Sequence, residues 1–158
     1  MSTIFLDIDG VLNSTKSIEE NYLKGNKEDA DKIFIPQSVF LINMLTSVKS
    51  ADVVISSTWR YNMEKVIKVF KKNNLKTRNI VGRTPFLEST RGAEIKKYLK
   101  LNKNIEDFII IDDDRDMEPF LDRLIHVKRK TGFDNHDYIK SLKMLGGKNV
   151  SQKMSKLQ

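Results

Sequence analysis

The sequence predicts a doubly wound α/β domain, with a parallel sheet of about five strands and helices on both of its faces. Five short runs are continuously apolar, as expected of parallel strands that are buried on both faces. Helical patterns separate these runs, and strands that alternate with helices typically form parallel sheets. The expected strands are residues 3–8, 52–56, 79–82, 107–112 and 124–128.

The helices between these strands are marked by apolar spacing and by residues that favour helix ends. Pro36 is a favourable opening residue for the first of them. Asp116, a good N-cap, predicts another helix that begins near it, with Pro119 in its first turn. A Gly-Gly pair stops the last helix. Besides the one near Asp116, the expected helices cover residues 39–48, 63–70, 95–99 and 135–145.

The length of 158 residues fits one domain with a real core. The chain has no cysteine, which excludes disulfides and thiolate metal sites and leaves oxygen atoms and two histidines as ligands. It also has no apolar run of 18 residues and no secretory leader at its start, so we expect no membrane contact and a cytoplasmic location.

We expect one domain over residues 1–145, in which the polar segment 14–35 is a small flap or a mobile loop. Residues 146–158 form a basic tail that we expect to be flexible. Part of the net charge of +7 lies near this end, because residues 141–158 carry four lysines and no acid. The tail either touches polyanions or is a solvated end without a role.

The most informative stretch is residues 4–13, where an apolar run ends in Asp7 and is followed by Asp9 and Gly10. Residues i and i+2 of a strand share a face, so the two carboxylates project together where Gly10 can turn the chain. Adjacent carboxylates repel each other. A divalent cation, or a division of roles into nucleophile and proton carrier, explains the pair, whereas a plain Asp-Gly turn is the alternative.

A second strand delivers acids to the same edge of the sheet. The run 109–111 is followed by Asp112, Asp113 and Asp114. Asp112 directly follows the apolar run and is the first choice as metal ligand, with Asp113 next. A solvated turn that caps the next helix is the alternative for Asp114.

Two further segments offer groups that bind phosphate. Ser56 and Ser57 follow the second strand, and hydroxyls at a strand end before a helix form a natural site for phosphate oxygens, although such clusters also cap helices. Arg60 follows closely and could bind a phosphate through two nitrogens. Arg91, which opens the helix before the fourth strand, could lie over both the acids and the phosphate.

These segments together resemble the haloacid-dehalogenase (HAD) superfamily of aspartyl-phosphate enzymes. Residues 7–13 resemble its first motif, 53–56 its second and 110–113 its acidic fourth, while Arg91 stands where the third has Lys or Arg. More narrowly, Ser-Thr-Trp-Arg at 57–60 and Arg-x-x-Glu-Ile from Arg91 resemble the small HAD domains of RNA-repair proteins. Those domains are akin to the phosphatase half of polynucleotide kinase-phosphatase.

The resemblance implies a role for each residue. Asp7 would attack phosphorus and form an aspartyl-phosphate, and Asp9 would protonate the leaving oxygen and then activate water. Mg²⁺ would be held by Asp7, the backbone carbonyl of Asp9 and the fourth-motif acids, Asp112 first and Asp113 next. Phosphoryl oxygens would be bound by Ser56 and Arg91, with Ser57 and Arg60 as further candidates.

Access to the site favours a large substrate. The intervals that hold a cap domain in many HAD relatives contain only the 14–35 segment with one helix, and residues 83–90. The expected function is therefore that of a capless, Mg²⁺-dependent phosphatase acting on a DNA or RNA end or a nucleotide. A phosphoprotein phosphatase or nucleotidase of the same fold, a phosphotransferase, and a non-catalytic binding module are the alternatives.

Overall fold

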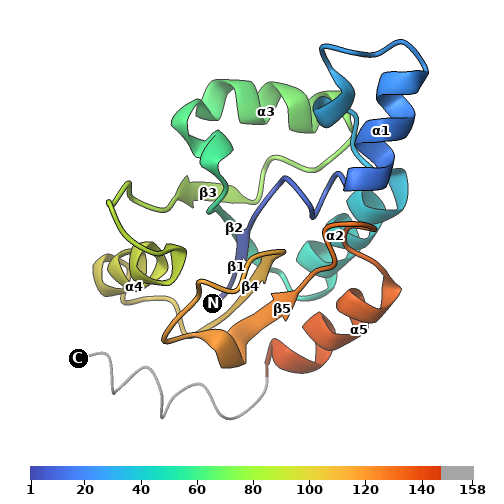
Figure 1. Ribbon diagram of the computed structural model, residues 1–158. Coiled ribbons are helices and arrows are strands. Elements are labelled where there is room, and N and C mark those ends of the chain that lie inside the picture. Colours follow the sequence, from blue (N-terminus) through green and yellow to red (C-terminus); the bar gives the residue numbers. More distant parts are fainter. Residues whose placement is uncertain (147–158) are drawn as a thin grey trace.

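The computed structural model describes residues 1–146, and Figure 1 shows a twisted sheet with helices on both of its faces. The basic tail proposed from the sequence lies outside the described residues from position 147 onward. The strands are β1 (Ser2–Leu6), β2 (Asp52–Ile55), β3 (Ile80–Arg83), β4 (Asp107–Asp112) and β5 (Leu124–His126). The α-helices are α1 (Thr15–Leu23), α2 (Pro36–Val48), α3 (Met63–Lys72), α4 (Arg91–Leu101) and α5 (Asn135–Met144), and the short 3₁₀ helices are η1 (Ala30–Lys32), η2 (Thr58–Tyr61) and η3 (Leu121–Arg123).

The sheet is entirely parallel and has the strand order β3-β2-β1-β4-β5, so the predicted doubly wound fold is confirmed. The chain leaves β1 toward one edge of the sheet through β2 and β3, and returns to the other side of β1 with β4. The order reverses between β1 and β4, which is the place where open α/β sheets bind ligands, at the carboxyl ends of the strands.

Side chains alternate between two hydrophobic clusters, one on each face of the sheet. Ile4 and Leu6 of β1 belong to the larger cluster, which α2, α3 and α5 cover. Phe5 belongs to the smaller cluster, which α4 covers with Ile95 and Leu99. Because neighbouring strand residues face opposite ways, continuous apolar runs are needed to fill both clusters.

The helix predicted near Asp116 is wrong. Residues 113–120 form a loop, and η3 is the helical turn that follows it. Met117 and Phe120 are buried in the cluster beneath α4, which fixes the loop against the sheet. Asp116 does act as a helix cap, but for α4: its carboxylate accepts the Arg91 amide at 3.1 Å and its carbonyl accepts the Gly92 amide at 3.0 Å.

The 14–35 segment contains α1 and η1. Ser14 caps α1 in a reciprocal arrangement with Ser17, and Asn21 donates to the carbonyls of Ala30 and Ile33, both at 3.3 Å. Within residues 1–146 this segment is far smaller than a cap domain, so the site at the strand ends stays open on this side. No helix in that part of the chain has the length and apolar character needed to cross a membrane.

Candidate active site

The alternation of side chains directs the polar residues at three strand ends toward α4. The strand residues Phe5, Val54 and Ile110 pack beneath this helix. The backbone ladder continues past the strand ends, since the Asp7 amide donates to Ile111 and the Ser56 amide donates to Leu6, both at 3.0 Å. Because side chains two positions apart share a face, the next residues on that face are Asp7, Ser56 and Asp112.

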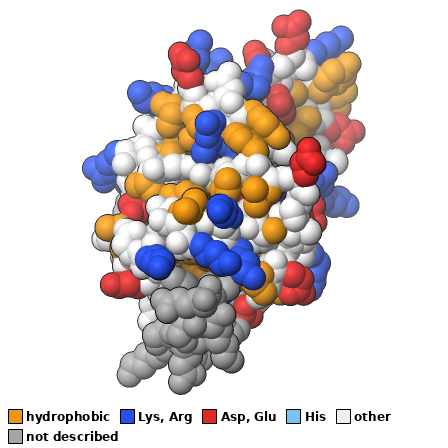
Figure 2. Space-filling view, turned by 90° about the vertical axis from the view of Figure 1, so that its left-hand side faces the viewer, with side chains coloured by type: hydrophobic (Ala, Val, Ile, Leu, Met, Phe, Trp, Pro, Cys, Tyr) orange, Lys and Arg blue, Asp and Glu red, His pale blue; other side chains and the backbone are white. Residues whose placement is uncertain are grey.

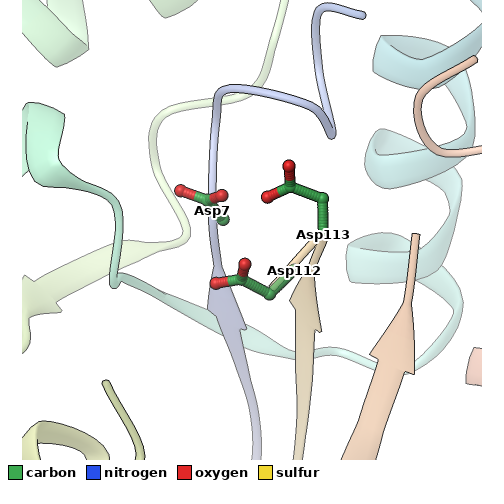
Figure 3. Close-up of side chains that lie close together, drawn as sticks. All are labelled: Asp7, Asp112 and Asp113. Carbon is green, nitrogen blue, oxygen red and sulfur yellow. The ribbon is translucent and has the colours of Figure 1, made fainter. Parts of the chain in front are cut away.

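Three carboxylates meet where β1 and β4 end. Oxygen atoms of Asp7, Asp112 and Asp113 all lie within 4.8 Å of one another. Asp7 is 4% exposed and Asp112 is fully buried, and the side chain of Asp113 is also buried, although its backbone is partly exposed. Figure 3 shows Asp7 above the end of β1, with Asp112 and Asp113 reaching toward it from the end of β4. The structure therefore brings together the first-motif and fourth-motif acids that the sequence placed on this edge.

Arg91 lies against the two buried acids. Its Nη1 is 3.3 Å from Oδ1 of Asp7 and donates to Oδ2 of Asp112 at 2.5 Å. Burial raises the pKa of Asp7 well above its usual value, and the charge of Asp112 raises it further, while Arg91 opposes both effects. Burial likewise raises the pKa of Asp112 to about 6, against the lowering effect of Arg91. Two buried carboxylates thus share one guanidinium, which leaves an excess of negative charge.

Asp113 faces the turn that follows Asp9. Gly10 has a φ of +80°, and a Cβ at this position would collide with the carboxylate of Asp113. Glycine is therefore required here both by the backbone conformation and by the close approach of the acid. Arg129, from the loop after β5, donates to the other side of the cluster at Oδ2 of Asp113.

The donor set fits Mg²⁺. Hard divalent cations prefer carboxylate and carbonyl oxygens, and the cluster offers three carboxylates and no sulfur or imidazole. Asp7 and Asp112 are too buried for water to solvate their charges fully, so a cation compensates them better than solvent can. Asp7, Asp112 and Asp113 are the side chains that could hold the ion.

The carboxylate of Asp9 is turned away from this cluster and is held by two donors. Nδ2 of Asn13 donates to its Oδ1, and the indole Nε1 of Trp59 donates to its Oδ2, both at 2.9 Å. Asn13 in turn accepts the Gly10 amide at 2.8 Å, which ties it to the same turn. The structure thus separates the two first-motif acids: Asp7 faces the carboxylate cluster, and Asp9 is fixed by Asn13 and Trp59.

The two serines after β2 differ in their contacts. Ser56 is fully buried, and within residues 1–146 its hydroxyl has no hydrogen-bond partner. A buried hydroxyl without a partner costs free energy unless a ligand completes it. Ser57 instead caps η2, because its hydroxyl accepts the Trp59 amide at 3.3 Å. Of the two serines, Ser56 is therefore the better-placed candidate for a phosphate ligand.

Arg60, proposed from the sequence as a phosphate ligand, is engaged inside the protein. Its guanidinium donates to the carbonyls of Ser56, Ser57, Thr84 and Pro85, at 3.0–3.3 Å. Its Nη2 also lies 2.8 Å from Oε2 of Glu94, and both side chains are buried. These contacts use all five N–H donors of an arginine. Arg60 thus joins the ends of β2 and β3 to α4 and has no donor left for a substrate.

The two segments that resemble the HAD domains of RNA-repair proteins, residues 57–60 and the one that begins at Arg91, lie close together in the structure. Trp59 of the first segment contacts Asp9, and Arg60 contacts Glu94 of the second segment. Arg91 of that second segment contacts Asp7 and Asp112. The sequence alone did not identify the roles of Asn13, Trp59 and Glu94, because their partners lie on other elements. The spacing Arg-x-x-Glu was the one signal available for Glu94.

Comparison with protein families finds a match over residues 3–138 to the family described as the HAD domain in Swiss Army Knife RNA repair proteins. The match begins at the second residue of β1, covers the other four strands and ends four residues into α5, and it contains every residue of the site. Searches of the curated proteins and of the solved structures found no match. Given the extent of the family match and the cluster at the carboxyl ends of β1 and β4, the chain belongs to the HAD domains of Swiss Army Knife RNA repair proteins.

Proposed function

We propose that this domain is an Mg²⁺-dependent phosphatase that hydrolyses a phosphomonoester at the end of a polynucleotide. The observation that carries the proposal is the pair of buried carboxylates, Asp7 and Asp112, that share the single guanidinium of Arg91. Such a pair is costly to folding and suits a site that receives a divalent cation and a phosphoryl group. The family match adds the HAD chemistry and the setting of RNA repair.

In the proposed reaction, a carboxylate oxygen of Asp7 attacks phosphorus and the bond to the leaving oxygen breaks. Asp9 gives its proton to that leaving oxygen, which departs as an alcohol. Asp9 then takes a proton from a water molecule that attacks the aspartyl-phosphate. Inorganic phosphate leaves, and Asp7 is regenerated. Asn13 and Trp59 position Asp9 for both transfers through their hydrogen bonds to its carboxylate.

The surrounding residues would stabilise the charge of the transferred group. Ser56 offers its unpartnered hydroxyl, and Arg91 offers guanidinium donors at the same edge of the sheet. Mg²⁺ held by Asp7, Asp112 and Asp113 would neutralise phosphoryl oxygens as charge develops. Each of these groups acts on the phosphoryl end of the substrate, so none of them selects the leaving alcohol.

Two features favour a polynucleotide over a phosphopeptide. The site has no cap domain within the described residues, so a long chain can enter. In the segments that follow β2 and β3, the rings of Tyr61 and Phe86 stack at 4.2 Å with Tyr61 71% exposed, and the Arg83 guanidinium lies 5.3 Å from the Phe86 ring. On the side of β3 and α4, Figure 2 shows hydrophobic and basic side chains interspersed, with acids mostly near the edges. Exposed rings with cations are typical of surfaces that stack bases.

A substrate panel tests the proposal. The purified protein is assayed with Mg²⁺ or with EDTA on p-nitrophenyl phosphate, on 3′- and 5′-phosphorylated DNA and RNA oligonucleotides, on mononucleotides and on phosphopeptides. We expect Mg²⁺-dependent release of phosphate, with the highest kcat/KM on an oligonucleotide end. Preference for phosphopeptides or mononucleotides would instead support the protein phosphatase or the nucleotidase. Absence of hydrolysis, together with no heat of Mg²⁺ binding by calorimetry, would support a binding module.

A further inference from the structure

A basic groove lies outside the carboxylate cluster, between α3 and the η1 segment. It encloses about 580 Å³. Four lysines line it, three from α3 and one from η1, and Val69 and Ile33 contribute apolar surface. The lysines are Lys32, Lys65, Lys68 and Lys72.

The charged residues that line the groove are four lysines against one acid, with Asp31 and Glu28 also acting on Lys32. Lys65, Lys68 and Lys72 are spaced at i, i+3 and i+7, so they lie on one face of α3. Asp29 is the one acid among the lining residues, and it is paired with Lys32 at 2.9 Å. Among residues 1–146, the three lysines of α3 have no carboxylate within ion-pair distance. Lysines on a helix commonly face solvent, but here cations from two elements border the same depression.

The groove connects to the proposed active site through Trp59. The Nζ atom of Lys65 lies 4.9 Å from the centroid of the Trp59 ring, and that ring donates its N–H to Asp9. One end of the groove is therefore a single indole ring away from the acid that would protonate the leaving oxygen. A substrate chain that continues beyond the leaving oxygen would start beside Asp9, one indole ring away from Lys65.

We infer that the groove binds the phosphodiester backbone of a single-stranded nucleic acid whose terminal phosphate lies at Asp7. The inference rests on the proposed function, because the leaving oxygen gives the strand its direction away from Asp9. From Lys65 to Lys72 the helix rises about 10 Å, at about 1.5 Å per residue, so the three lysines form a row of cations along α3. Regularly spaced phosphates match a row of cations better than a peptide with scattered acids does.

Binding measurements with matched variants test the groove. The probe is a fluorescein-labelled single strand of about 12 nucleotides with a terminal phosphate, followed by fluorescence anisotropy on the Asp7→Asn protein at several salt concentrations. Adding Lys68→Gln and Lys72→Gln should weaken binding about fivefold or more and lower the salt slope by about 1.4, because each phosphate contact to a single strand contributes about 0.7. The control pair, Lys140→Gln and Lys143→Gln on exposed positions of α5, should leave both values unchanged.

Each outcome decides the inference. Equal losses from the groove pair and the control pair would mean that charge alone attracts the strand and would overturn the inference, as would no loss from the groove pair. Poly-glutamate that competes as well as the oligonucleotide would show a general anion surface, which also overturns it. Phosphate release from p-nitrophenyl phosphate by the unchanged protein tests the proposed function separately. If the oligonucleotide binds in the groove but p-nitrophenyl phosphate is not hydrolysed, only the proposed phosphatase activity is refuted.

Discussion

Replacing Asp7 by Asn should stabilise the metal-free protein while abolishing turnover. At an effective dielectric constant of about 20, each unit charge within 4.8 Å repels Asp7 by about 3.5 kcal/mol, and Asp112 and Asp113 both lie in this range. Arg91, at 3.3 Å, attracts it by about 5 kcal/mol. Counted for these three groups alone, the charges disfavour ionised Asp7 by about 2 kcal/mol. Arg129, which is paired with Asp113, reduces this repulsion, and burial adds to it.

Thermal unfolding in EDTA at pH 7.5 measures this effect. A gain of about 2 kcal/mol should raise the Tm by about 4–8 °C in a domain of this size. Glu20→Gln, an exposed carboxylate on α1, serves as the control and should change the Tm little. With Mg²⁺ in excess the order should reverse, because the ion stabilises the unchanged protein and loses a ligand in the variant.

The pH dependence follows from the direction of the pKa shift. The folded protein holds the Asp7 proton to a higher pH than the unfolded chain does, so metal-free stability falls as pH rises above about 4. The advantage of Asp7→Asn should therefore disappear as pH falls to about 4. A variant that is less stable than the unchanged protein in EDTA at pH 7.5 would refute the electrostatic reasoning, and retained hydrolysis of p-nitrophenyl phosphate would refute the role of Asp7 as nucleophile.

Three more substitutions test the supporting residues. Trp59→Phe keeps an aromatic ring against Phe34 but loses the hydrogen bond to Asp9, so kcat should fall about tenfold or more while the Mg²⁺ affinity measured by calorimetry is unchanged. Gly10→Ala should weaken Mg²⁺ binding in the same assay, because the added Cβ collides with the carboxylate of Asp113. Gly25 also has a positive φ, of +96°, but open space around it, so Gly25→Ala should lower the stability of the fold without changing Mg²⁺ binding. Arg60→Met should destabilise the fold by about 3–5 kcal/mol in urea, because Glu94 is left buried without its charge partner. Arg60→Met with Glu94→Leu should recover only part of that loss, because the four carbonyls that Arg60 bonds still lose their donor.

The fold could be predicted from the sequence because each buried strand contributes apolar side chains to both faces of the sheet. Each run must fill two hydrophobic clusters, so β1, β2 and β4 appear in the sequence as continuous apolar stretches. The helix α1 gave no such signal because it has no buried residue. Its one local signal was the capping arrangement of Ser14 and Ser17.

The candidate site was predictable where a residue's position on a strand decides its contacts. Asp7, Ser56 and Asp112 follow from strand ends and alternation alone. Arg60 shows the limit of this reasoning, since an arginine beside a predicted phosphate site is indistinguishable by sequence from one that is buried. Only the folded chain brings the carbonyls after β2 and β3 within reach of its guanidinium, together with Glu94 of α4.

The buried Arg60 and the Arg91 of the proposed site are connected through α4. Arg91 and Glu94 are three residues apart, so they lie on one face of the helix. The bond between Glu94 and Arg60 fixes the rotation of α4, and the bonds from Asp116 to the amides of its first turn fix the position of its start. Together these contacts aim the Arg91 guanidinium at Asp7 and Asp112. Arg60, which has no donor free for a phosphate, would thus still support the proposed phosphate binding by positioning the arginine that would perform it.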